Sequence, residues 1–76
     1  MPHVIVKTWP VKSEQQKHQM AEAVTKAIMS TTGYGPDAVS VGIEEVQPNE
    51  WTDKVYKPDI LGKPDTIFKK PGYSPF

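Results

Sequence analysis

The proline at position 2 is the residue of this sequence whose chemistry depends most on its place in the chain. Pro2 directly follows Met1, so removal of Met1 would make its nitrogen a secondary amine at the chain terminus. A terminal amine has a reference pKa of about 7.7–8.0, and modest desolvation leaves much of it uncharged at neutral pH. Such an amine can serve as a general base. The simpler interpretation is a proline that opens a strand, where no N–H donor is needed.

The segment that follows predicts a strand and then a helix. Residues 3–9 are rich in β-branched and aromatic side chains, and a proline at position 10 ends the strand. Ser13 and Gln16 form the pattern of a capping box, which predicts a helix over residues 14–32, ended by a glycine. Helical spacing predicts a buried face made of Met20, Ala23, Val24, Ala27 and Ile28.

A second strand is predicted over residues 39–46. Apolar side chains alternate there with small or polar ones: Val39, Val41 and Ile43 against Ser40, Gly42 and Glu44. Strand, helix and strand make a βαβ unit with two parallel strands, so the expected fold class is α+β. Two strands under one helix leave sheet edges and one sheet face uncovered, which predicts a partner chain.

The remainder of the chain is rich in proline and glycine. A short helix is predicted from Pro48 to about Lys57, because Pro58 interrupts any longer element. Residues 67–73 are expected to be a short extended segment closed by a Pro-Gly turn of type II, with positive φ at Gly72.

The composition excludes several classes of protein. The chain has 76 residues, no cysteine, and nine lysines against nine acidic residues, so its formal net charge is zero. It therefore lacks the positive field that attracts nucleic acid, and no segment is apolar enough to span a membrane or resembles a signal peptide. A cytoplasmic location is the expectation. His3 and His18 are too few, and lack acidic partners at ligand spacing, for a metal site.

Several of these features occur together in one known family. The chain has a proline after Met1, a βαβ pattern whose second strand covers residues 40–46, Trp51, and the ending Phe68–Ser74. It resembles the 4-oxalocrotonate tautomerase family, and its ending resembles the small bacterial phenylpyruvate-tautomerase-type (PptA-like) members. The resemblance implies an isomerase, a keto–enol tautomerase that needs no cofactor. Met1 would be removed, and the Pro2 nitrogen would act as general base and acid.

The resemblance also assigns substrate-binding positions, at Lys12, Ser40 and Trp51. One carboxylate-binding arginine of the family aligns with Lys12, a second aligns with Ser40, and a pocket phenylalanine aligns with Trp51. Lysine cannot make the bidentate fork of arginine, and serine offers a neutral hydroxyl. The implied substrate is therefore a 2-oxo acid or its enol with one carboxylate, such as phenylpyruvate.

We expect one tautomerase-like domain over residues 1–76, with a core over 2–51 and a C-terminal extension over 52–76. A homodimer with a four-stranded sheet is expected, with a hexamer as the alternative, and each site is built partly from the neighbouring chain. Two other functions remain open: hydration or dehalogenation of an unsaturated acid, with Glu44 and Glu45 as candidate groups, and ligand binding without catalysis.

Overall fold

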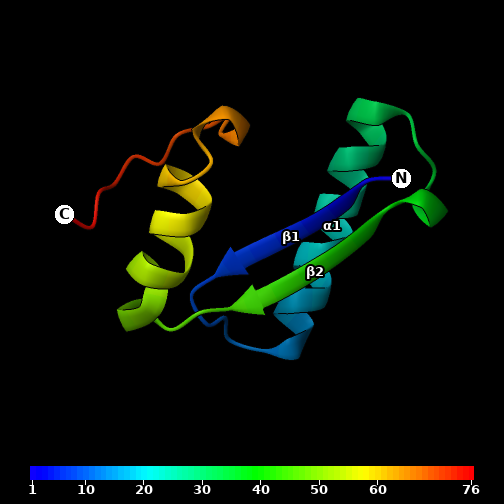
Figure 1. The fold of residues 1–76 in the computed structure, drawn as a ribbon. Coiled ribbons are helices and arrows are strands. Elements are labelled where there is room, and N and C mark those ends of the chain that lie inside the picture. The colour runs from blue at the N-terminus through cyan, green and yellow to red at the C-terminus, as the bar shows by residue number, and fades with distance from the viewer. The chain divides into compact units, whose positions relative to one another are not determined.

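The computed structural model describes residues 1–76, and the chain forms two compact units, Met1–Glu45 and Val46–Phe76. The first unit is a βαβ motif (Figure 1) made of strand β1 (His3–Thr8), helix α1 (Glu14–Thr32) and strand β2 (Ser40–Glu45). This confirms the predicted order of elements, although each strand is shorter than predicted. The division into a core over 2–51 and an extension over 52–76 stays a prediction.

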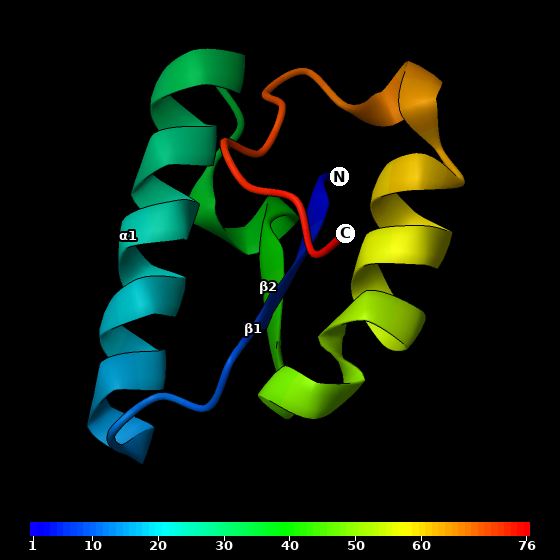
Figure 2. The ribbon, with the colours of Figure 1, turned by 90° about the vertical axis from the view of Figure 1, so that its left-hand side faces the viewer.

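The two strands are parallel and in continuous register. His3 is paired with Ser40 at the start of the sheet, and Thr8 is paired with Glu45 at its end. Helix α1 lies along one face of the strands in both views (Figures 1 and 2). Parallel strands joined by a helical crossover are the expected result of this element order. The start of β1 and the start of β2 therefore meet at one end of the sheet.

Local sequence signals determine both ends of helix α1. The Ser13 hydroxyl accepts a hydrogen bond from the Gln16 backbone N–H at 3.1 Å, as the capping box predicted. Gly33 follows the helix with φ of 82°, and its N–H donates to the Met29 carbonyl at 2.9 Å. Only glycine adopts this left-handed conformation without steric cost, so Gly33 sets the helix end.

The buried face of α1 is rotated from the predicted one. Ala23 and Ala27 are exposed, which corrects their predicted place on that face. The half-buried positions are instead Lys17, Met20, Ala21, Val24, Thr25, Ile28 and Met29. Alanine is small enough for either face, so the spacing of alanines does not indicate which face of the helix is turned toward the sheet. Thr25 is accommodated because its hydroxyl donates to the Ala21 carbonyl at 2.8 Å.

The sheet has one face toward α1 and one face away from it. Val41 lines a groove with α1 residues, and the Glu45 carboxylate pairs with Lys17 of α1. Side chains alternate along a strand, so Ser40 and Gly42 lie on the opposite face, together with their register partners His3 and Ile5. The side chain of Ile5 is 51% exposed there. The face that carries Ser40 is thus not covered by the helix.

The second unit is built from short helical turns. They cover Pro48–Glu50, Thr52–Leu61 and Pro64–Thr66. The prediction that a helix ends at Lys57 is wrong, because the middle segment contains Pro58 and continues to Leu61. Its hydrogen bonds follow the wider π pattern, as in the Gly62 N–H donating to the Lys57 carbonyl at 2.8 Å. The wider turn accommodates a proline ring that an ordinary α-helix would place against a carbonyl.

The ending of the chain also differs from the prediction. Residues 67–73 pair with no strand, and the only glycine with positive φ is Gly33, so the type II turn at Gly72 is wrong. Side chains hold this unit instead. The Tyr56 ring lies 5.7 Å from that of Tyr73 and 5.6 Å from that of Phe76, between ring centroids. Tyr56 and its neighbour Val55, 7% and 5% exposed, are the only two buried residues of the chain.

None of the helices combines the length and the apolar character that crossing a membrane requires.

Candidate active site

Pro2 lies immediately before β1 and is half-buried. Its carbonyl oxygen accepts a hydrogen bond from the Ser40 backbone N–H at 3.2 Å, which extends the ladder between the strands by one residue. Met1 is 94% exposed, so no other part of the chain covers it. With Met1 attached, the Pro2 nitrogen is an amide and has no basic lone pair. A basic nitrogen at this position therefore requires removal of Met1.

Ser40 is the predicted site residue that the structure brings next to Pro2. It is the first residue of β2, and its side-chain oxygen lies 2.6 Å from Nδ1 of His3. The pair follows from the register, because His3 and Ser40 are opposite each other on the sheet face away from α1. The sequence itself does not indicate this contact, because His3 and Ser40 are 37 positions apart and only the strand register brings them together.

Lys12 is not brought to Pro2 within one chain. It is exposed and follows the carboxyl end of β1, whereas Pro2 precedes the amino end. Six residue steps separate Pro2 from Thr8, which is about 20 Å of extended strand at roughly 3.3 Å per residue. This separation exceeds the reach of a lysine side chain. A site that uses both Pro2 and Lys12 must take them from two copies of the chain.

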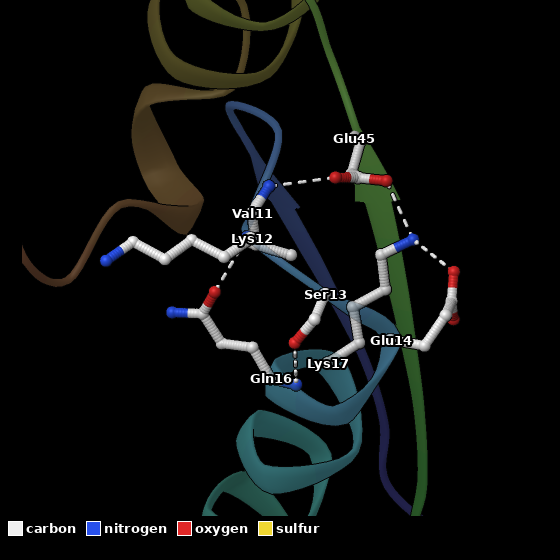
Figure 3. Close-up of polar contacts among 7 residues, drawn as sticks. All are labelled: Val11, Lys12, Ser13, Glu14, Gln16, Lys17 and Glu45. Carbon is white, nitrogen blue, oxygen red and sulfur yellow. Dashed lines mark hydrogen bonds and ion pairs between the residues drawn. The ribbon is translucent and has the colours of Figure 1, made fainter.

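The loop that carries Lys12 is held by a network of polar contacts (Figure 3). Glu45, the last residue of β2, accepts a hydrogen bond from the Val11 backbone N–H at 2.8 Å and pairs with the Lys17 ammonium at 2.7 Å. Lys17 also reaches Glu14 at 3.2 Å. The Lys12 backbone N–H donates to the side-chain oxygen of Gln16 at 2.8 Å. In Figure 3 the Lys12 side chain itself points away from this network.

These contacts shift the pKa of both charged partners of the ion pair. The hydrogen bond from Lys17, and next the one from Val11, lowers the pKa of Glu45 below its ordinary value. The hydrogen bonds to Glu45 and then to Glu14 raise the pKa of Lys17. Glu45 is therefore a bound, ionised carboxylate. Because its pKa is lowered and its two oxygens are held by Val11 and Lys17, Glu45 is a weaker base toward water, which disfavours the water-activating role of the hydratase alternative.

Trp51 belongs to the second unit, where it is half-buried. Its indole N–H donates to the Tyr73 hydroxyl at 3.0 Å. The indole donor thus already has a partner within its own unit, and the indole presents mainly an apolar surface to other molecules. Its role as a wall of the Pro2 pocket stays a prediction.

The chain is similar in sequence and fold to known tautomerases. Residues 2–54 match the family model described as "Tautomerase enzyme". The chain is 43% identical to "Tautomerase PptA" of Pectobacterium carotovorum subsp. carotovorum (strain PC1) over 75 residues, which cover 97% of this chain and 99% of the relative. It is 37% identical to a "Probable tautomerase" of Xylella fastidiosa (strain 9a5c), with coverage of 96% and 89%.

Among solved structures, the chain is similar to TomN, a 4-oxalocrotonate tautomerase homologue in the tomaymycin biosynthetic pathway. The TM-score is 0.62 and the identity is 34%, over 66% of this chain and 77% of TomN. YwhB, another 4-oxalocrotonate tautomerase homologue, gives a TM-score of 0.58 at 37% identity, over 60% and 75% of the two chains. A matched family model, full-length relatives and the shared βαβ fold agree, and the chain therefore belongs to the tautomerase family of isomerases, with the small PptA-type members among its relatives.

Proposed function

We propose that this enzyme is a cofactor-independent keto–enol tautomerase of a 2-oxo acid or its enol, with phenylpyruvate as the model substrate. The Pro2 nitrogen, freed by removal of Met1, accepts the hydroxyl proton of the enol. The same nitrogen then delivers a proton to the carbon next to the new carbonyl, so the number of protons on the enzyme is unchanged after one turnover. No metal or organic cofactor takes part in either transfer.

The observation that carries this proposal is the position of Pro2, which lies directly before β1 and is preceded only by the exposed Met1. Its carbonyl is fixed by Ser40 at 3.2 Å, while the Met1 residue that blocks its nitrogen is 94% exposed. Loss of Met1 leaves every ladder hydrogen bond in place and creates an amine of low intrinsic pKa beside a polar pair. Half-burial of Pro2 supports a further decrease in that pKa, because desolvation disfavours the protonated form.

The substrate class follows from the groups that would hold a carboxylate. Lys12 supplies one flexible positive charge and Ser40 supplies one neutral hydroxyl, in place of two arginines. These groups suit one carboxylate better than two, because neither makes a bidentate pair. Trp51 would then form the apolar wall against the aromatic ring of a substrate such as phenylpyruvate.

We also propose that the active form is an oligomer, a homodimer first and a hexamer as the alternative. The sheet has only two strands and therefore two unpaired edges, and Ile5 is 51% exposed on the face without the helix. Pro2 and Lys12 lie at opposite ends of β1, so a second copy is the source of Lys12 for each Pro2. Sedimentation analysis of the Met1-free protein tests the assembly directly, and a monomer with full activity would contradict it.

The decisive experiment compares two forms that differ only at the chain terminus. The rate of phenylpyruvate enol-to-keto conversion is measured for the Met1-free protein and for protein that retains Met1, with intact mass establishing each form. A positioned acid–base group contributes typically 10²–10⁴-fold, so retention of Met1 should reduce kcat/KM by about that factor. Equal rates for the two forms would show that the Pro2 nitrogen is not the base.

A further inference from the structure

We propose that His3 and Ser40 together form the subsite for the substrate carboxylate, with His3 deciding in which direction the Ser40 hydroxyl donates. This inference deepens the proposed function and rests on it. Three observations carry it: the 2.6 Å contact between Nδ1 of His3 and the Ser40 oxygen, the register that pairs the two residues, and the Ser40–Pro2 backbone hydrogen bond. The backbone hydrogen bond links this polar side-chain pair directly to Pro2.

The direction of this hydrogen bond has a chemical consequence. A serine hydroxyl has one proton and two lone pairs. If Nδ1 of His3 is unprotonated, it accepts that proton, and Ser40 has nothing left to donate to a carboxylate. If Nδ1 carries a proton, it donates to the Ser40 oxygen, and the hydroxyl proton is released toward a ligand. A carboxylate only accepts, so it selects the state in which Nδ1 of His3 is protonated.

The surroundings of the pair fit an anionic ligand. Both side chains are exposed on the sheet face away from α1. The next strand residues on that face are Ile5 and Gly42, and the nearest charged strand positions, Lys7 and Glu44, come four residues further along. Four residues correspond to about 13 Å at roughly 3.3 Å per residue. No acidic strand residue of this face is therefore close enough to occupy the imidazole in place of a ligand.

The Ser40 hydroxyl is then the one donor that the pair offers to a ligand, and the His3 N–H holds the hydroxyl in that direction. The ligand class is a carboxylate on a small organic acid, held next to the Pro2 nitrogen.

The test uses a carboxylate that cannot tautomerise, so that binding is measured apart from catalysis. Phenylacetate binding to the Met1-free oligomer is followed by NMR titration for wild type, His3→Phe, Ser40→Ala and the double variant. Ser40→Ala should raise the dissociation constant about tenfold, because it removes a hydrogen bond to a charged group. His3→Phe should raise it by up to the same factor, because it removes the N–H that directs the Ser40 hydroxyl toward the carboxylate. The double variant should bind about as weakly as either single one, since both act through one contact. Effects that multiply to about a hundredfold would overturn the proposal.

Two further variants separate the proposed role from a general loss of structure. His3→Arg can only donate to the Ser40 oxygen, so it should keep the affinity within about threefold of wild type. His18→Phe makes the same replacement at an exposed histidine of α1 and should leave binding unchanged. If His3→Phe behaves like His18→Phe, His3 has no part in carboxylate binding.

The tautomer itself provides an independent readout. Nitrogen-15 spectra of the side chain should show Nδ1 of His3 protonated in the phenylacetate complex, and an unprotonated Nδ1 in that complex would contradict the mechanism. In kinetics with phenylpyruvate, His3→Phe should raise KM about tenfold while kcat stays within twofold. Tautomerase activity that depends on Pro2 but not on His3 would refute this subsite alone. Phenylacetate binding that depends on His3, in a protein without tautomerase activity, would refute the proposed function alone.

Discussion

Gly42 has no structural reason within this chain to be glycine, and its replacement by alanine is therefore informative. It lies inside β2 opposite Ile5, in continuous register without a bulge, and its φ is not positive. A Cβ atom built at Gly42 would have no other atom of the chain within 4 Å. Glycine inside a strand costs roughly 0.5–1 kcal/mol relative to alanine. We infer that a ligand or a second copy of the chain approaches this position.

The Gly42→Ala variant should therefore gain stability and lose function. At a concentration where the chain is monomeric, removal of the glycine penalty should increase the free energy of unfolding by roughly 0.5–1 kcal/mol. For a domain of this size, that gain raises Tm by about 2–8 °C. If a ligand or a second copy packs against Gly42, an added methyl group there costs about 1–3 kcal/mol. This cost predicts a decrease of roughly fivefold to a hundredfold in kcat/KM or in the association constant of the chains.

The matched control is Gly35→Ala. Gly35 also has no atom within 4 Å of a built Cβ, its backbone is extended with φ of −79°, and it lies in the loop before β2. This variant should keep full activity and assembly. Thermal unfolding, sedimentation and phenylpyruvate kinetics on both variants provide the comparison. If Gly42→Ala is as active and as associated as Gly35→Ala, nothing approaches this face. If Gly42→Ala gains no stability, glycine carries no penalty at this position of the strand.

Three further predictions concern the contacts around the site. Because the folded-state pKa of Glu45 lies below its ordinary value of 4.5 and that of Lys17 lies above its ordinary 10.5, their pair should stabilise the fold between those two values. This contribution should be lost as pH falls through the lowered pKa of Glu45 or rises through the raised pKa of Lys17. The urea midpoints of wild type and Glu45→Gln should therefore converge in acid. A difference that stays constant with pH would contradict the pairing. Ser13→Ala removes the cap of α1 and should cost about 1 kcal/mol in urea unfolding, whereas Ser13→Asp should retain most of the stability. Tyr73→Phe removes the acceptor of the Trp51 indole and should cost about 0.5–1.5 kcal/mol while keeping the ring contacts; an unchanged midpoint would show that the hydrogen bond contributes nothing.

Local signals in the sequence determined the elements of the βαβ unit. The β-branched segment before Trp9, the Ser13 cap and Gly33 each act within a few residues, so they locate the strand and the helix without knowledge of the rest of the fold. The chemistry available to Pro2 was equally local, because it depends only on the residue type and on its position after Met1. The effect of Pro58 was not local in this sense, because the wide helical turn that tolerates a proline has no clear sequence signal.

Only the tertiary structure decided which of these residues meet. The strand register places His3 against Ser40, and the direction of β1 separates Lys12 from Pro2. Strand register and helix rotation result from the sum of contacts between segments far apart in sequence. Alanines that suit either face of a helix do not determine its rotation. The chemical identity of the candidate site residues is therefore a property of the sequence, whereas the pairing of His3 with Ser40 and the separation of Lys12 from Pro2 are properties of the fold.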